Sequence, residues 1–477
     1  IIFCLPEDRV VTRTMLNLAG ALFKIVLVGG MFWGILHGYH FEARLTLLPG
    51  LDLVLRSGPL AMLFVTLSSG LWLVTTVYAV GYLEGSPHRS RFFGFFSLCV
   101  TATTGVALAG NLITFLLFYE LLTLCTYPLI VHRGTEIARQ AGRNYLIYTI
   151  IGGALLLLSS VWLYTLAGTL EFTDRGFLSG LDASLHPTLM IIFCLLIAGL
   201  GVKAALVPLH GWLPQAMVAP APVSALLHAV AVVKAGAFGI IRVVYDVYGI
   251  EFANSLGLTL PLAILAAVTI IYGSLRALFQ DELKRRLAFS TVSQVSYIVL
   301  GIALASPIAT LGGLIHLVHQ GVQKITLFMC AGNLAETLGI HKISEMNGVG
   351  RRMPWTMAAF TIGAFGMIGA PPLAGFFSKW YLGLGALDAG QGWVIYVLAV
   401  SSALNAAYFL PILYTAWFKA PPDSWPAERS FGNKETAWTL LVPPIVTALL
   451  TLALGLLAFA PFNLLEWTRL IVSRGFA

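Results

Sequence analysis

Apolar runs of about twenty residues recur along the whole chain, separated by short polar loops. A helix of that length crosses a hydrocarbon core about 30 Å thick. Helices are expected because lipid cannot satisfy open backbone groups and the alternation of a membrane barrel is absent. The runs predict helices at 14–37, 59–83, 92–109, 112–131, 144–167, 188–214, 223–246, 257–275, 287–304, 308–335, 355–386, 392–418 and 436–462. With Ile1–Leu5 as the tail of one more, the prediction is an all-α polytopic membrane protein of about 14 helices.

Composition supports a membrane protein. Of 477 residues, 58% are hydrophobic and only 10% are charged, which excludes an ordinary soluble globular protein. No loop exceeds about twenty residues, so a single transmembrane domain over 1–477 is expected. The five cysteines are scattered without paired spacing, so neither a disulfide framework nor an iron–sulfur or zinc site is indicated.

Basic residues gather in alternate loops, which is a topology signal. The net charge of +7 therefore does not indicate a nucleic-acid partner. One set of loops carries Arg9, Arg13, Arg89, Arg91, Arg133, Arg139, Arg143, Lys284, Arg285, Arg286, Lys342, Arg351, Arg352, Lys419, Arg429 and Lys434. The opposite loops carry few basic residues. The pattern predicts a bacterial inner (cytoplasmic) membrane location, with the basic loops in the cytoplasm and both true termini outside.

Lone ionisable residues stand near the middle of several apolar runs. A charge at the bilayer centre costs about 2.5–3.5 kcal/mol, so such residues normally face a bundle interior or a wet cavity and serve proton relays or ion paths. Proton or cation translocation is therefore the leading hypothesis. The candidate site residues are Glu120, Lys203, His228, Lys234, His316, His319, Lys324 and Lys379.

Two spans combine a lysine with helix-breaking prolines. In 188–214 the prolines follow Lys203, and in 355–386 they precede Lys379. Interrupted helices in corresponding halves of a chain indicate a transport site, because broken ends free backbone groups to line a cavity. The separation of the two spans suggests two related halves, at about 92–246 and 257–418.

Glu120 and Lys203 are candidates for a switching pair. Thr123 shares the helix face of Glu120. The carboxylate would tune how tightly a nearby lysine holds its proton; the alternative is a structural ion pair, which apolar packing could replace. Snorkelling does not explain Lys203, because it lies too far from either end of its span.

The later candidates point to proton transfer rather than to metal binding. His228 and Lys234 are six residues apart, about 9 Å along a continuous helix, so transfer between them needs water or another helix. A lone buried histidine is usually a core residue, but the lysine nearby favours function.

One face of the next polar helix is expected to be wet. His316, His319, Gln320, Gln323 and Lys324 fall within about 140° of one helix face. No inward Cys, Asp or Glu accompanies the two histidines, which argues against a metal site. The preceding helix adds a polar stripe suited to holding water, made of Ser290, Ser293, Gln294 and Tyr297.

Three segments resemble the proton-conducting antiporter-like subunits found in respiratory complex I, membrane-bound hydrogenases and Mrp-type cation/proton antiporters. They are Pro208 to Gly236, Gln280 to Tyr297 and Pro371 to Lys379. The resemblance implies 14 helices with two inverted five-helix repeats, one broken helix in each, and a central chain of lysines and water. In length the chain is most similar to the D-type component of Mrp-type antiporters.

The resemblance also implies roles. Glu120 would be the coupling glutamate and Lys203 its partner, with His228 and Lys234 on a bridging helix. Lys324 would be the central lysine and Lys379 the lysine near the exit. Where some relatives carry a histidine four residues before the central lysine, this chain has Gln320; His319 is expected to compensate.

The sequence therefore predicts a proton-translocating subunit of a multi-subunit cation/proton antiporter complex, without cofactors of its own, with other membrane subunits, protons, Na⁺ and lipid as partners. Alternatives left open are a subunit of a redox-driven complex I or hydrogenase-like complex, and a proton-coupled partner in inorganic-carbon uptake. Direct Na⁺/H⁺ exchange in this chain is disfavoured because mid-membrane carboxylates are scarce apart from Glu120. A quinone-binding or redox subunit lacks haem-spaced histidines and cysteine clusters. Lys24 has no assigned role.

Overall fold

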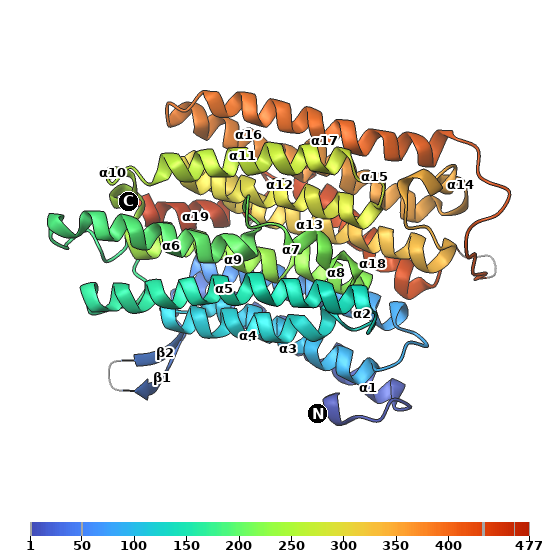
Figure 1. Cartoon of the computed structure of the whole chain (residues 1–477), viewed down its shortest axis with the longest axis horizontal. Coiled ribbons are helices and arrows are strands. Elements are labelled where there is room, and N and C mark those ends of the chain that lie inside the picture. Colours follow the sequence, from blue (N-terminus) through green and yellow to red (C-terminus); the bar gives the residue numbers. More distant parts are fainter. Residues whose placement is uncertain (1, 49–50, 432–434, 462, 477) are drawn as a thin grey trace.

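The computed structural model describes residues 2–48, 51–431, 435–461 and 463–476, so Ile1 of the predicted tail and Lys434 of the last basic loop lie outside the described residues. The chain is predominantly helical (Figure 1). Its helices are α1 (Val10–Leu36), α2 (Pro59–Tyr82), α3 (Arg89–Leu108), α4 (Leu112–Ile130), α5 (Glu136–Ala167), α6 (His186–Ala204), α7 (Trp212–Gln215), α8 (Ala221–Ala229), α9 (Val232–Arg242), α10 (Ile250–Ser255), α11 (Thr259–Leu278), α12 (Leu283–Ala303), α13 (Pro307–Leu338), α14 (Val349–Arg352), α15 (Pro354–Ile368), α16 (Ala374–Asp388), α17 (Trp393–Phe418), α18 (Trp438–Leu456) and α19 (Leu464–Phe476). Shorter elements are the 3₁₀ turns Ile2–Cys4, Ala183–Leu185, Ala216–Val218 and Ile343–Glu345, the π-helix η4 (Val243–Tyr248), and the strands β1 (Glu42–Leu48) and β2 (Leu51–Arg56).

Eleven of the thirteen predicted spans are confirmed as helices. Among the described residues, 11 helices are long and apolar enough to cross a membrane. Two predicted runs fall outside that set for physical reasons. The helix α13 has 32 residues but is too polar in its middle, and the run 355–386 is divided into the short helices α15 and α16.

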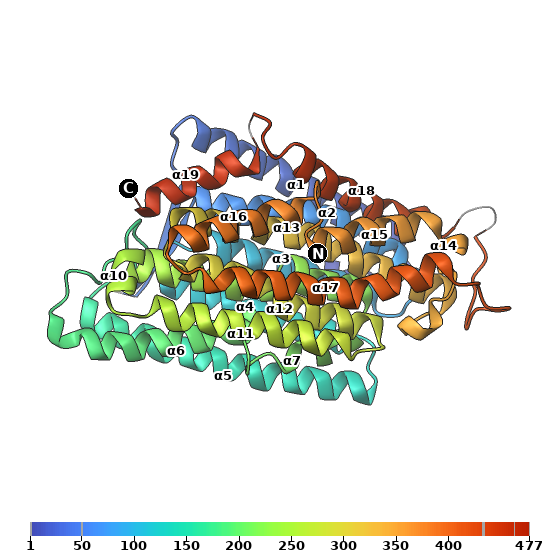
Figure 2. The ribbon, with the colours of Figure 1, turned by 90° about the horizontal axis from the view of Figure 1, so that it is seen from above.

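The helices lie lengthwise beside one another (Figure 1). Seen from above, α5 and α6 form one edge of the bundle, α1, α18 and α19 form the other, and α12 and α13 lie between them (Figure 2). The segment Ala221–Tyr248 is wholly buried and Leu283–Ala303 almost so, whereas α1 is mostly exposed. The residues furthest from lipid therefore lie on α8, α9, α12 and α13.

Both predicted helix breaks are present. The helix α6 ends at Ala205, whose φ of 57° places it in the left-handed region that terminates helices. The helix α15 ends at Gly369 with φ 93°, a conformation that favours glycine. Each break lies next to one of the predicted lysines.

A third break was not predicted. The expected run 223–246 is not one continuous helix, because α8 ends at Ala229 and α9 begins at Val232. Ala229 lies directly against α13, where its carbonyl oxygen is 3.0 Å from the place a Cβ of Gly321 would occupy. The 9 Å separation of His228 and Lys234 expected for an unbroken helix therefore does not apply.

A β-hairpin, also not predicted, projects from one end of the bundle (Figure 1). Its strands pair antiparallel, with Glu42 opposite Arg56. Glu171, in the loop after α5, ties the hairpin to the bundle, 2.7 Å from Arg44 and 3.2 Å from Arg56. The hydrogen bond from Arg44 holds the pKa of the Glu171 carboxyl below its ordinary value.

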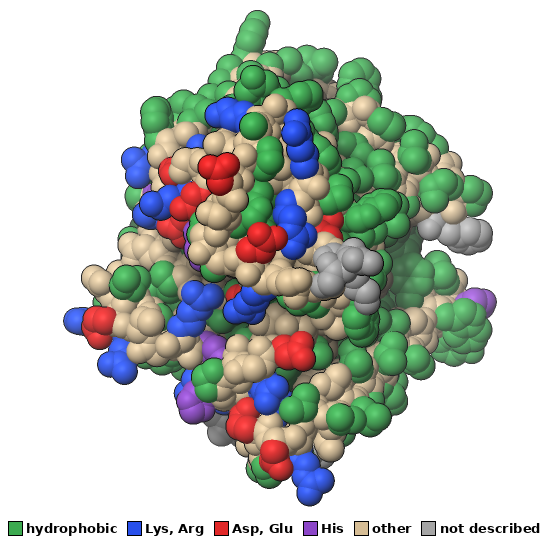
Figure 3. Space-filling model, turned by 90° about the vertical axis from the view of Figure 1, so that its right-hand side faces the viewer, with side chains coloured by type: hydrophobic (Ala, Val, Ile, Leu, Met, Phe, Trp, Pro, Cys, Tyr) green, Lys and Arg blue, Asp and Glu red, His purple; other side chains and the backbone are tan. Residues whose placement is uncertain are grey.

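Charged side chains gather at the end of the bundle opposite the hairpin. The end opposite the hairpin gathers Lys and Arg side chains, with Asp and Glu among them and hydrophobic side chains around them (Figure 3). The C-terminal end of the described chain lies at the hairpin end (Figure 1). This arrangement agrees with the division of loops into two sets that the basic residues predicted.

Candidate functional site

Glu120 and Lys203 come from neighbouring parts of the bundle but do not form an ion pair within 4.0 Å. Asn111 caps α4 by accepting a hydrogen bond from the amide of Thr114, and this start places Glu120 mid-helix. Lys203, in the last turn of α6, is fully buried. Its Nζ donates to the carbonyl of Tyr119 and lies 3.3 Å from the centroid of that ring.

The Glu120 carboxylate is held in a tight space against α5. A Cβ added at Gly153 would lie 2.6 Å from its carboxyl carbon. Its Oε1 is buried without a hydrogen-bond partner among the described residues. Glu120 and Lys203 remain close enough to interact electrostatically. Glu120 and Lys203 therefore lie near each other without an ion pair, and Tyr119 holds the ammonium of Lys203 instead.

The bridging residues both contact α13. The ring of His228 stacks on Phe328 with centroids 4.4 Å apart, and neither of its nitrogens has a described partner. Lys234, across the third break, donates from Nζ to the carbonyl of Leu317 at 2.7 Å. The two side chains are therefore connected through α13 rather than along one helix.

The polar face of α13 lies against α12 and α16. Nδ1 of His316 is 2.8 Å from Oγ of Ser378, and its ring lies 5.1 Å from that of Tyr297. Lys324 donates to Oγ of Ser290 at 2.7 Å and to the carbonyl of Leu287 at 3.1 Å. Ser290 and Tyr297 of the predicted stripe on α12 therefore contact this helix, whereas Ser293 is hydrogen-bonded to Ser274 on α11.

Three buried amide side chains accompany these residues. They are Gln294 on α12 and Gln320 and Gln323 on α13, each fully buried with both amide atoms unpartnered in the described structure. Buried polar groups normally satisfy their hydrogen bonds with protein or with ordered water. This set of amides therefore gives the centre of the bundle the polar lining that bound water requires.

His319 lies elsewhere. It borders a cavity of about 320 Å³ whose other walls are mainly apolar residues of α16, α18, α19 and the loop between the last two, among them Phe377 and Leu450. Its Nδ1 has no described partner. Among the described residues, the histidine expected to compensate for Gln320 therefore makes no hydrogen bond to the polar side chains around Lys324.

Lys379 is anchored at the second break. Its Nζ donates to the carbonyls of Met367 and Ile368, at 3.0 and 2.8 Å, and to Oγ of Ser402 at 3.1 Å. These carbonyls are in the last turn of α15, where helix ends leave acceptors unsatisfied and the macrodipole is negative. The break itself therefore supplies the acceptors that hold the ammonium.

Sequence reasoning missed the polar face of α17. Asn405 and Tyr408 are fully buried and hydrogen-bonded to each other at 2.6 Å, and Tyr408 also contacts Ser290 at 2.7 Å. Ser401 accepts from Tyr297 at 2.7 Å. The signal was available, because residues 401, 405 and 408 have the i, i+4, i+7 spacing of one helix face within an otherwise apolar run.

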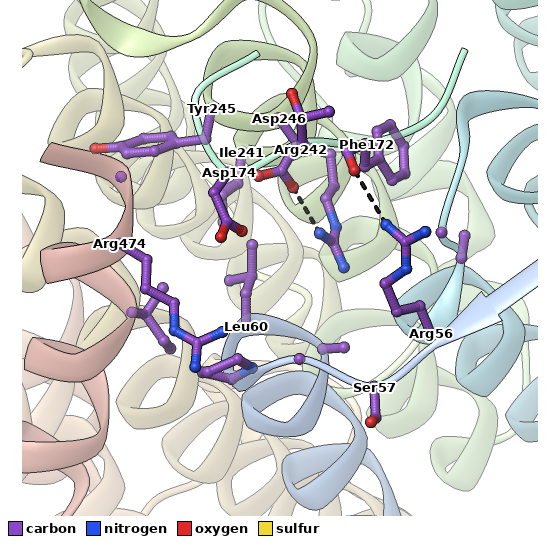
Figure 4. Close-up of a pocket in the computed structure, with 18 of the residues that line it drawn as sticks. Arg56, Ser57, Leu60, Phe172, Asp174, Ile241, Arg242, Tyr245, Asp246 and Arg474 are labelled. Carbon is purple, nitrogen blue, oxygen red and sulfur yellow. Dashed lines mark hydrogen bonds and ion pairs between the residues drawn. The ribbon is translucent and has the colours of Figure 1, made fainter. Parts of the chain in front are cut away.

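Another cavity is lined by none of these residues. It has a volume of about 480 Å³ and lies at the hairpin end, lined in part by β2, α9, η4 and α19. Arg242 and Asp246 form an ion pair of 2.6 Å in its wall, and Arg56 reaches the carbonyl of Phe172 (Figure 4). No candidate residue predicted from the sequence lines it. Lys24, also unassigned, lies 5.5 Å from the ring of Trp72, off the row.

Comparison with known proteins decides the family. The family described as NADH:quinone oxidoreductase/Mrp antiporter, transmembrane, matches residues 109–405. The chain belongs to this family. Its resemblance to antiporter-like subunits, expected from three motifs, is thereby confirmed.

Relatives in the NADH:quinone oxidoreductase/Mrp antiporter family include redox-complex and antiporter subunits. NADH-quinone oxidoreductase subunit N of Desulforudis audaxviator is 37% identical over 422 residues, covering 87% of this chain and 82% of the relative. Hydrogenase-4 component B of Escherichia coli is 31% identical, covering 85% and 63%. The D-type component of the Na(+)/H(+) antiporter of Bacillus subtilis is 29% identical, covering 85% and 80%.

Solved structures show the same fold. The membrane-bound sulfane sulfur reductase, an archaeal respiratory membrane complex, matches with a TM-score of 0.83 at 26% identity, over 97% of this chain and 91% of the other. The Mrp complex from Dietzia sp. matches with a TM-score of 0.80 at 24% identity, over the same shares. Both similar structures are multi-subunit membrane complexes.

Proposed function

We propose that this chain translocates protons as one membrane subunit of a multi-subunit cation/proton antiporter complex. The observation that carries the proposal is a row of buried titratable and amide side chains in the centre of the bundle, between the helix breaks at Lys203 and Lys379. Burying several lysines in the membrane costs free energy, and lysines found there normally take part in charge movement. The relatives, named for redox complexes and for antiporters, support the same class of activity.

The first pair acts as the switch in this proposal. When Glu120 approaches Lys203, its negative charge stabilises the ammonium; when the pair is open, as here, Lys203 gives up its proton more easily. The released proton moves through His228, Lys234 and the α13 face toward Lys379. Charge movement is therefore directed along the membrane plane.

The chain supplies the proton path and its partners supply the driving force. Among the described residues, no three His, Cys, Asp or Glu side chains gather into a metal-binding group. Any sodium path or redox centre is assigned to partner subunits. The basic end of the bundle is placed in the cytoplasm and the hairpin end outside an inner membrane.

Proton flux in vesicles tests the proposal. The intact complex is reconstituted into liposomes that enclose a pH-sensitive dye, and a potassium diffusion potential drives protons inward. Lys324→Met should lower the flux at least tenfold, because it removes the central carrier. The control Lys24→Met, which removes a partly buried lysine outside the row, should leave the flux within about twofold of wild type. An assembled Lys324→Met complex with full proton flux would refute the proposal.

A further inference from the structure

Resting on the proposed function, a second connection between two of its lysines can be traced through residues with no assigned role. Lys324 donates to Ser290 at 2.7 Å, and Ser290 contacts the hydroxyl of Tyr408 at 2.7 Å. Tyr408 donates to Asn405 at 2.6 Å. Asn405 then donates to the carbonyl of Met367 at 3.2 Å, as does Lys379 at 3.0 Å. An unbroken hydrogen-bonded chain therefore joins the central lysine to the lysine of the second break.

The carbonyl of Met367 fixes the direction of every bond in this chain. A carbonyl can only accept, so Asn405 must turn its NH₂ toward Met367 and its oxygen toward Tyr408. Tyr408 has one proton and gives it to Asn405, so the hydroxyl of Ser290 must donate to Tyr408. The oxygen of Ser290 is then free to accept from Lys324. All the dipoles therefore point the same way, from Lys324 toward the end of α15.

The chain cannot carry a proton from one lysine to the other. An amide NH₂ does not exchange its protons along such a path, and the carbonyl of Met367 has none to give. What it can carry is orientation, because hydrogen bonds in series polarise one another in a low-dielectric interior. Asn405 and Lys379 donate to the same carbonyl. A change in the hydrogen bond from Lys379 to that carbonyl therefore alters how strongly the dipoles of the hydrogen-bonded chain are aligned, as far as Lys324.

We propose that Tyr408 and Asn405 position this chain so that the charge on Lys379 is sensed at Lys324, coupling the end of the proton path to its centre. Burial favours this role, since Lys324, Ser290, Asn405 and Tyr408 are all fully buried. Arg286 anchors the chain on its other side by donating to the carbonyl of Tyr408 at 3.0 Å. The protein has Gln320 where some relatives have a histidine, and this coupling links the two lysines without passing through residue 320.

Other titratable groups face the same lysines and could alter a pH profile. Lys234 on α9 and His228 on α8 lie within electrostatic range of Lys324. His316 on α13 and Tyr297 on α12 lie near Lys379. The test therefore compares variants within the chain while leaving these groups unchanged.

The pH dependence of proton flux in reconstituted complex is the readout. Tyr408→Phe and Asn405→Leu should each shift the midpoint of the profile, by at most about one pH unit, because each breaks the series of polarised hydrogen bonds that ends at Lys324. The double variant should shift it no further, because the two residues act in series. The control Tyr78→Phe removes another fully buried hydroxyl, one that donates to the carbonyl of Met329 at 2.9 Å, and should leave the midpoint unchanged.

The proposal would be overturned by midpoints that stay at the wild-type value in assembled complexes, and also by shifts that add in the double variant. Loss of assembly in both Tyr408→Phe and Asn405→Leu, with Tyr78→Phe intact, would assign the chain to folding alone and would overturn it as well. A wild-type complex that moves no protons would instead count against the proposed function.

Discussion

The two predicted helix breaks hold their lysines in different ways. At the first, Lys203 precedes the break and faces the ring and carbonyl of Tyr119. Glu120, the residue after Tyr119, carries the carboxylate. At the second, Lys379 follows the break and binds two backbone carbonyls and a hydroxyl. Neither lysine has a carboxylate within ion-pair distance among the described residues, but Lys203 interacts electrostatically with Glu120, whereas Lys379 has no such carboxylate partner there.

The two breaks therefore differ in whether the group that holds the lysine can change its charge. A carboxylate can move and can lose its charge by protonation, so its effect on a neighbouring ammonium varies. Carbonyl dipoles at a helix end are fixed and do not titrate. The first break is therefore suited to changing the proton affinity of its lysine, and the second to keeping a constant hold.

The largest effect is expected from Glu120→Gln, which removes the charge of the carboxylate but keeps the shape of the side chain. Proton flux through the reconstituted complex should fall at least tenfold, because Lys203 loses its variable partner. Glu84→Gln, an exposed carboxylate in the loop after α2, is the control and should have no measurable effect. Full flux with assembled Glu120→Gln would mean that the first break does not switch.

A smaller effect is expected from crowding the switch. Gly153→Ala places a methyl group 2.6 Å from the carboxyl carbon of Glu120, so the carboxylate must move or lose freedom. Flux should fall severalfold while the complex still assembles. The matched control is Gly29→Ala on α1, where an added Cβ meets nothing within 4 Å. Equal flux in the two alanine variants would show that Glu120 needs no freedom to move.

The smallest effect should come from Glu171, a carboxylate paired with arginines in water rather than in the bundle. Its pKa lies below the ordinary value of 4.5 because it accepts a hydrogen bond from Arg44. A depressed pKa in the folded state means that the stabilisation is present above the unfolded value and is lost as pH falls through the folded one. Amide exchange of the hairpin, corrected for intrinsic rates, should therefore accelerate modestly below pH 4.5.

Glu171→Gln is the control for that measurement. It should remove part of the acid dependence of the exchange, the rest coming from Glu42 and Asp52, which pair with the same arginines. It should leave proton flux unchanged, because the surface pair has no part in the switch. A flux loss as large as that of Glu120→Gln would erase the distinction between the buried and the exposed carboxylate.

The helices and the buried charges could be predicted because both leave a strong local signal in the sequence. A run of about twenty apolar residues indicates a span, and a lysine within it stands out. Prolines near Lys203 and Lys379 indicated the two breaks. The break after Ala229 has no proline or glycine of its own; there the backbone lies directly against Gly321, a contact between distant residues that local pattern does not reveal.

The directions of side chains were harder to predict than their positions. Helical spacing placed His319 at the edge of the polar face of α13, but α16 and α18 surround it with apolar residues. The same spacing would have revealed Asn405 and Tyr408, had the polar residues of that run been compared. The hairpin alternates polar and apolar positions over too few residues to compete with the surrounding helical signal, so no strand was predicted there.

A double-variant cycle on proton flux tests most directly whether Glu120 and Lys379 lie at opposite ends of one path. Flux is measured for Glu120→Gln, for Lys379→Met and for the two together, in complexes matched for assembly. Steps in series predict that the double variant retains the residual flux of the worse single variant, because blocking one path twice changes nothing further. Fold-losses that multiply in the double variant would show that the two residues act independently and would contradict a single row of coupled residues.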